Sequence, residues 1–170
     1  MIKAIIYNSQ TGSCKRYAEE LSRFLALPAY ALGQQPAIKD GEVIYVSWVM
    51  AGTVVGYSKV KKQLPVAAVC AVGMAPVTEG SAAFGREKNQ VPGSVGYFCL
   101  QGGFNINKLP LPMNLIMRLK VKDIAKKLEF KRLKTPLNAQ EQATYVMATT
   151  GRGEPASWDV SEIVAWVKQR

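Results

Sequence analysis

Histidine is absent from this chain of 170 residues, and cysteine occurs only three times. Without histidine there is no Ser-His-Asp or Cys-His nucleophile, no histidine general base and no usual zinc or non-haem iron ligand set. Cys14, Cys70 and Cys99 are widely spaced and odd in number, which predicts neither a disulfide framework nor a CxxC metal knuckle. We therefore expect any redox or group-transfer chemistry to come from a cofactor.

Long apolar runs are also lacking. No stretch reaches the roughly 18 apolar residues of a transmembrane helix, and the start MIKAIIYNSQTGS becomes polar too early for a signal peptide. No linker divides the chain, whose length is typical of one domain. We expect a single domain over residues 1–170 in the cytoplasm, with a peripheral contact on the inner face of the membrane left open.

Acidic residues are scarce. There are 12 of them against 22 basic residues, a net charge of +10. The segment Arg118–Lys134 holds eight basic and two acidic residues, so it supplies +6 of that excess. Such a block attracts phosphates, anionic lipid or an acidic partner, or it is simply a solvated helix face. Nucleic acid is not favoured, because only the charge argues for it.

Apolar runs alternate with helical patterns through the first hundred residues. Continuous apolar strands between helices are typical of a parallel sheet covered on both faces, which is the α/β class. The expected strands are 3–7, 29–32, 42–47, 66–72 and 94–100, and the expected helices are 12–27, 54–64 and 76–89.

The character of the sequence changes after Gly103. The apolar positions 117, 121, 124 and 128 predict an amphipathic basic helix, with Asn114 as its N-cap, inside an insertion at about 109–134. A further helix is expected over 139–150, capped by Asn138 and ended by Gly151. Asp159 and Glu162 have capping-box spacing before a last helix.

The most informative segment follows the first strand and runs into a helix: Ser9, Gln10, Thr11, Gly12, Ser13 and Cys14. Hydroxyl groups and free backbone N–H groups at a helix N-terminus favour an anion. The segment lacks the lysine of a Walker A loop and the glycine triplet of a dinucleotide fingerprint. It suits one phosphate group, although an ordinary Ser/Thr-rich turn would have the same composition.

At these residues the sequence resembles the flavodoxin family, whose fingerprint is Thr/Ser-x-Thr-Gly-x-Thr. Ser9, Thr11 and Gly12 match it, and Cys14 stands where the family usually has threonine. The segments VIYVSW, YFCLQGG and SEIVAWVKQR extend the resemblance along the chain. It implies a flavodoxin-like doubly wound sheet of five parallel strands, in the order 2-1-3-4-5, with a C-terminal helical extension. The implied cofactor is FMN, and the chain would be a flavoprotein.

The resemblance also implies a binding role for three loops. The first, Ser9 to Cys14, would bind the phosphate group. One side of the flavin ring would be lined by Ser47, Trp48, Val49, Met50, Ala51 and Gly52. The other side would be lined by Leu100, Gln101, Gly102, Gly103 and Phe104.

Two of these residues have alternative interpretations. Trp48 would stack on the ring, or it is a core tryptophan closing the sheet edge. Cys14 would have a lowered thiol pKa at its helix N-terminus, or it is a small residue in place of threonine. No catalytic acid or base and no metal ligand can be named.

The basic charge departs from typical acidic flavodoxins, which dock on basic redox partners, and 51–62 contains no Asp or Glu. In character the chain resembles the flavodoxin-like, quinone-dependent protoporphyrinogen dehydrogenases, which have a basic helical insertion. This implies an oxidoreductase passing electrons between FMN and a quinone or porphyrinogen. Two alternatives remain: a basic electron carrier for an acidic partner protein, and a flavodoxin-fold binding domain without flavin.

Overall fold

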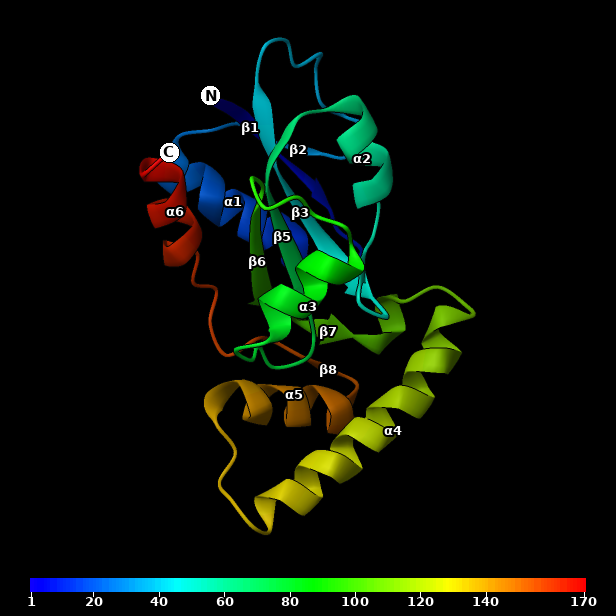
Figure 1. The fold of residues 1–170 in the computed structure, drawn as a ribbon. Helices are drawn as coiled ribbons and strands as arrows, with labels where there is room; N and C mark the ends of the chain where they lie inside the picture. Colours follow the sequence, from blue (N-terminus) through cyan, green and yellow to red (C-terminus); the bar gives the residue numbers. More distant parts are fainter.

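A computed structural model describes residues 1–170 as an α/β structure built on a mainly parallel sheet (Figure 1). The strands of this sheet are β1 (Ile2–Asn8), β2 (Ala29–Ala31), β3 (Glu42–Met50), β4 (Thr53–Val54), β5 (Val66–Gly73) and β6 (Gly96–Gln101). Neighbouring strands in the order β2-β1-β3-β5-β6 pair in parallel, whereas β4 pairs antiparallel with β3.

The strand order therefore differs from the expected order 2-1-3-4-5, because β4 is an additional strand between β3 and β5 in the chain. It folds back on β3 through Ala51 and Gly52, which both have positive φ values of 49° and 82°. Consecutive residues of this kind form the tight turn of a two-residue hairpin. The predicted helix over 54–64 begins only at Tyr57 for this reason.

Helices cover both faces of the sheet. One face packs against α1 (Ser13–Leu25) and α6 (Ser161–Lys168), and the buried core on that side includes Ile5, Ile44 and Cys70. The other face packs against α2 (Tyr57–Gln63) and α3 (Ser81–Lys88). A sheet buried on both faces explains why β5 is apolar along its whole length, as a parallel central strand should be.

A helical extension lies beyond the carboxyl ends of the strands (Figure 1). It consists of β7 (Phe104–Asn105), the 3₁₀ helix η1 (Ile106–Lys108), α4 (Met113–Arg132), α5 (Ala139–Thr150) and β8 (Arg152–Gly153). β7 and β8 pair antiparallel. A third, smaller core of five buried residues, among them Val121 and Met147, joins these elements. The basic helix expected inside 109–134 is α4.

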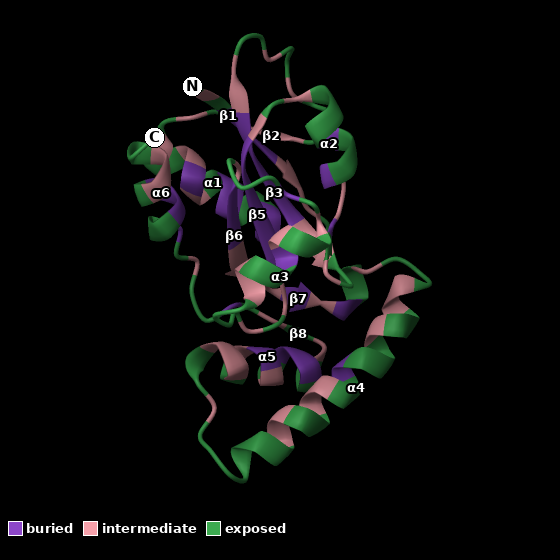
Figure 2. Cartoon of the chain, in the orientation of Figure 1, coloured by how far each residue is buried: buried purple, intermediate pink, exposed green.

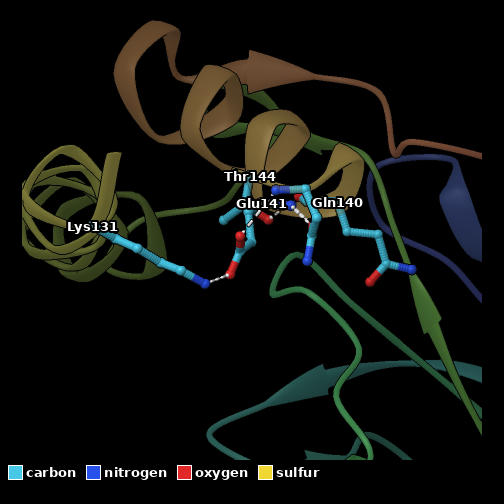
Figure 3. A network of polar contacts seen from close by, with 5 residues as sticks. Lys131, Gln140, Glu141 and Thr144 are labelled. Atoms are coloured by element: carbon cyan, nitrogen blue, oxygen red, sulfur yellow. Dashed lines mark hydrogen bonds and ion pairs between the residues drawn. The ribbon is translucent and has the colours of Figure 1, made fainter. Parts of the chain in front are cut away.

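Buried polar contacts attach α5 to the sheet. The Gln101 amide at the end of β6 donates to the Thr144 hydroxyl at 3.0 Å and to the Gln140 carbonyl at 2.8 Å, and the Thr144 hydroxyl lies 3.0 Å from the Met74 carbonyl. At the other side of α5, Lys131 of α4 forms an ion pair with Glu141 (Figure 3). The extension is thus joined to the sheet by a few specific contacts rather than by a broad apolar interface.

The expected bounds of α5 are confirmed, and α1 lies within the expected range 12–27. The Asn138 side chain accepts from the Glu141 N–H, and the Glu141 carboxylate accepts from the Asn138 N–H, which is a complete capping box. Gly151 ends the helix with φ 74°.

Two expected caps are wrong. Asn114 lies inside α4, where its amide donates to the Ile106 carbonyl at 2.6 Å instead of capping the helix. Asp159 and Glu162 form no capping box, because α6 begins at Ser161 and the Asp159 carboxylate accepts from the Ser161 N–H and hydroxyl. These two hydrogen bonds lower the pKa of Asp159.

The expected helix over 76–89 begins five residues later, at Ser81. A local turn precedes it, in which the Thr78 N–H donates to the Ser81 hydroxyl at 2.9 Å and the Ser81 N–H donates to the Thr78 carbonyl. Side-chain hydrogen bonds of this kind compete with helix formation. Phe84 of this helix is 62% exposed.

Candidate functional site

The loop between β1 and α1 lies at the carboxyl end of β1, beside the central strand β3. Gly12 has φ 105° and is the N-cap of α1, and no side chain caps this helix. Its own N–H donates to the Ser9 hydroxyl at 3.2 Å. The backbone N–H groups of the first turn of α1 therefore have no capping side chain, and a helix end of this kind favours an anion.

A cavity of about 380 Å³ adjoins this loop, and we name it the strand-end cavity. It is formed where β1, β3, β5 and β6 end, with α4 as the remaining wall. Its lining residues are Ser9, Gln10, Thr11, Ser13, Cys14, Trp48, Val49, Met50, Ala51, Val72, Gly73, Met74, Gly102, Gly103, Phe104, Leu109, Met113, Ile116, Met117 and Lys120. Twelve of the twenty are hydrophobic, and Lys120 is the one charged residue among them. The cavity is thus apolar, with the uncapped end of α1 at its border.

The structure brings together twelve of the predicted site residues, from all three predicted loops. They are Ser9, Gln10, Thr11, Ser13 and Cys14 from the first loop, Trp48, Val49, Met50 and Ala51 from the second, and Gly102, Gly103 and Phe104 from the third. The carboxyl ends of parallel strands meet at one edge of the sheet, so these loops converge although they lie far apart in the chain.

Five predicted residues do not line the cavity. Ser47 is fully buried and donates its hydroxyl to the Val55 carbonyl at 2.7 Å. Gln101 is buried in the contacts that attach α5. Leu100 packs against the core on the α1 side, Gly52 lies against Phe84, and Gly12 opens on a neighbouring cleft. Ser47, Gly52, Leu100 and Gln101 therefore belong to the frame of the site, whereas Gly12 lines the neighbouring cleft.

Eight lining residues were not predicted. Val72, Gly73 and Met74 come from the end of β5, which the three-loop prediction passed over. β5 lies between β3 and β6, so its carboxyl end necessarily separates the other two loops. The apolar run over 66–72 predicts this strand, so the residues that follow it could also have been predicted to line the site. The other five residues come from the α4 region: Leu109, Met113, Ile116, Met117 and Lys120.

Trp48 contacts both the core and the cavity. It packs against the core on the α1 side and also lines the strand-end cavity. Its indole Nε1 is the single buried side-chain polar atom without a hydrogen-bond partner. Buried donors are normally paired, so this unpaired donor distinguishes Trp48 from the other residues around the cavity.

The alternative of an activated thiol at Cys14 is wrong. Burial raises the pKa of the Cys14 thiol to about 12, and a hydrogen bond from its own backbone N–H offsets this only in part. Burial also raises the pKa values of Cys70 and Cys99. A protonated thiol is a poor nucleophile, so Cys14 acts as a small apolar wall residue.

Two apolar side chains that line the cavity are also exposed. Met50 and Ile116 are 45% and 51% exposed, and we name these two residues the apolar rim. Leu115 and Leu119 of α4 are exposed as well, but they do not line the cavity. Apolar side chains gathered around a cavity mark a surface that meets an apolar ligand or partner.

No helix of this structure has both the length and the apolar character needed to cross a membrane. No protein-family model matches the sequence. No curated protein matches it either.

Proposed function

We propose that this chain is an FMN-binding redox protein of the flavodoxin superfamily. The observation that carries the proposal is the position of the uncapped α1 N-terminus at the border of an apolar cavity between strand ends. If the short antiparallel β4 is left out and the five parallel strands are renumbered along the chain, the sheet order β2-β1-β3-β5-β6 becomes 2-1-3-4-5. This order supports a flavodoxin-like fold. A phosphate site joined to an apolar slot is what a phosphorylated flavin requires.

The residues around the cavity fit FMN in size and chemistry. The cavity volume lies within the range of roughly 300–1,000 Å³ that is usual for small-molecule sites. The first turn of α1, with the hydroxyls of Ser9 and Thr11, would hold the phosphate group. Trp48 and Met50 would border the ring from the β3 side, and Met74 from the β5 side.

FMN, when bound, supplies reversible uptake of one or two electrons. The chain itself would orient the ring and exclude water from it. Met113 and Met117 of α4 line the cavity and are half-buried, so this helix narrows access to the ring position. No side chain at the cavity is placed as an acid or base, and the protein's part is binding and positioning.

The chemistry of the cavity favours an oxidoreductase for a small organic substrate, a quinone or a porphyrinogen. The apolar rim suits a flat apolar molecule, and Lys120, the single cation of the cavity, suits an anionic substituent such as a propionate. An electron carrier needs an exposed ring edge for its partner protein, whereas here α4 forms an added wall. The first alternative is an electron carrier for an acidic partner protein, and the second alternative is a binding domain without flavin.

Contact with an anionic membrane surface through residues 118–134 belongs to the same proposal. Several cations of this segment, such as Lys122 and Lys126, have no carboxylate partner, and exposed Phe130 and Leu133 lie among them. Basic side chains attract anionic lipid, and apolar side chains enter the interface. We expect cosedimentation with vesicles containing anionic phospholipid and none with zwitterionic vesicles.

An absorbance spectrum tests the cofactor assignment first. The purified protein is mixed with FMN, desalted and measured, and retained flavin bands are the expected result. Trp48→Leu should weaken FMN binding roughly two- to tenfold through the lost aromatic contact. Trp166→Leu is the matched control, because Trp166 packs on Phe98 and beside Gly96, at the amino end of β6.

A folded protein that retains no FMN would overturn both redox interpretations and favour the binding domain. With flavin retained, turnover of a quinone with a small-molecule reductant supports the oxidoreductase. Reduction only through an acidic reductase would favour the carrier.

A further inference from the structure

A second hollow of about 650 Å³ lies beside the strand-end cavity, and we name it the basic cleft. Its lining residues are Thr11, Gly12, Ser13, Arg16, Gly103, Phe104, Asn105, Lys108, Val146, Thr150, Arg152, Gly153, Glu154 and Trp158. Thr11, Ser13, Gly103 and Phe104 line both hollows. Where the strand-end cavity is apolar, only three of the fourteen residues here are hydrophobic.

Three cations from separate elements face the basic cleft against one carboxylate. They are Arg16 of α1, Lys108 of η1 and Arg152 of β8. Arg16 lies 3.8 Å from Glu154, measured between Nη1 and Oε2, and both side chains are more than half exposed. Neither Lys108 nor Arg152 has a carboxylate within 4.0 Å. The cleft thus holds two uncompensated positive charges, an arrangement that an anion would stabilise.

Packing holds one of these cations, and secondary structure places the backbone of the other two. The Arg16 guanidinium lies 4.4 Å above the Trp158 ring, which itself packs against Tyr17 with 4.9 Å between ring centroids. Arg152 is paired with Asn105 in the β7–β8 ladder, and Lys108 ends the 3₁₀ helix that follows β7. The side chains of Lys108 and Arg152 are exposed, so their charged ends are accessible to a ligand.

We propose that the basic cleft binds the diphosphate portion of a nucleotide. Each phosphate group of a diphosphate carries at least one negative charge, so a diphosphate can match both unpaired cations, whereas one carboxylate would leave half of their charge unmatched. Arginine and lysine are both established phosphate ligands, and arginine binds phosphate through two parallel hydrogen bonds. Asn105 lines the cleft and uses only its side-chain oxygen, which accepts from the Asn107 N–H, so its side-chain NH₂ group suits a ribose hydroxyl. The volume agrees with a nucleotide rather than a free ion.

This inference goes beyond the proposed flavin site and does not depend on it, since it rests on the residues of the basic cleft. Two sources could supply the same chemistry. Because the two hollows share four lining residues, a flavin with an adenosine diphosphate half could occupy both. A separate nucleotide could instead occupy the basic cleft beside FMN.

Calorimetric titration of the full chain with ADP, with and without prior loading with FMN, tests the inference. We expect ADP to bind, and Arg152→Gln and Lys108→Gln each to weaken it by about tenfold or more, since each removes a charged hydrogen-bond partner. Lys59→Gln is the matched control, because Lys59 is exposed on α2 and far from the cleft in the chain. It should leave ADP affinity unchanged. Both cleft variants change exposed side chains, so their thermal unfolding should match that of the unmodified chain.

The results distinguish a dinucleotide flavin from a separate nucleotide, and they also distinguish failure of the cleft inference from failure of the proposed function. ADP binding to the FMN-loaded protein supports a separate nucleotide, and displacement of ADP by FAD but not by FMN supports the dinucleotide flavin. ADP binding without any retention of flavin would uphold the basic cleft and overturn the proposed function. The cleft inference is overturned if ADP fails to bind in either state, or if both cleft variants bind it as well as Lys59→Gln does.

Discussion

The parallel sheet and the α4–α5 extension bury their residues to very different degrees. In β5, six of eight residues are buried, whereas α4 has one buried residue, Val121, among twenty (Figure 2). The largest fully buried side chains of the sheet include Ile5, Ile6 and Tyr45, while the extension has a core of only five buried residues. The sheet is closed by helices on both faces, and the extension meets it at one end.

The difference in burial indicates that the sheet and the extension have different roles. Buried apolar area provides most of the stabilisation of a fold, so the sheet and its covering helices should dominate the free energy of unfolding. The extension places an apolar helix face against the strand-end cavity and leaves its cations and several apolar side chains of α4, such as Leu115 and Leu119, exposed to solvent. The chain thus combines a rigid frame with a weakly buried wall that is available to ligands and partners.

The largest expected effect contrasts the same substitution in both regions. Ile44→Ala removes a side chain that is 0% exposed at the centre of β3 and should lower the free energy of unfolding by about 2–5 kcal/mol. Ile116→Ala, on a residue 51% exposed in α4, should change it by less than about 0.5 kcal/mol. Urea unfolding followed by circular dichroism measures both. Equal losses would show that α4 is buried as deeply as the sheet.

The next prediction concerns the polar attachment of α5. Thr144→Val removes the hydroxyl that bonds the Gln101 amide and lies next to the Met74 carbonyl, which should cost about 1–3 kcal/mol because buried polar groups lose a partner. Thr149→Val, on the exposed side of the same helix, is the control and should be nearly neutral. Thermal and urea unfolding distinguish them. A neutral Thr144→Val would mean that apolar packing alone attaches α5.

A smaller loss is expected at the start of α5. Asn138→Ala removes the side chain that accepts from the Glu141 N–H and should cost about 1 kcal/mol. Asn107→Ala provides the comparison, because Asn107 is exposed and its side chain makes no hydrogen bond in this structure. The two variants are compared by urea unfolding. Similar values for both would contradict a capping role for Asn138.

The smallest effect is electrostatic and depends on pH. Hydrogen bonds from the Lys131 ammonium and then from the Asn138 N–H lower the pKa of Glu141. A lowered folded-state pKa means that this pair stabilises the fold above the unfolded pKa of Glu141, and that the stabilisation is lost as the pH falls through the folded value. NMR titration of the Glu141 carboxyl should give a midpoint below the usual glutamate range.

Lys131→Ala should raise that midpoint toward the ordinary value. Lys127→Ala is the control, because Lys127 pairs with Asp123 on the same helix at 2.8 Å. It should leave Glu141 unchanged. A midpoint that shifts equally in both variants would indicate a general charge effect of α4 instead of a specific pair.

Features that depend on a few neighbouring residues were predicted well. The buried strands and the Asn138 cap follow from apolar runs and local residue types, and the structure has both. The β4 hairpin was not predicted because Ala51 has a positive φ, which is unusual for alanine and cannot be expected from its residue type. The predicted N-cap role of Asn114 is wrong because its side-chain amide donates to the Ile106 carbonyl. This partner is available only because α4 packs on η1.

In the candidate site, too, some features depend on neighbouring residues and others on contacts between distant segments. The amino-acid sequence by itself determined the alternation of strands and helices, the Ser/Thr-rich segment with Gly12 at a helix start, and the basic segment 118–134, since each rests on local residue types and short periodicities. Only the tertiary structure decided that Met74 and Met117 line the same cavity, that Cys14 is buried with a raised pKa, and that Arg16, Lys108 and Arg152 face one cleft. The physical reason is that burial and convergence arise from contacts between segments far apart in the chain, which no local pattern records.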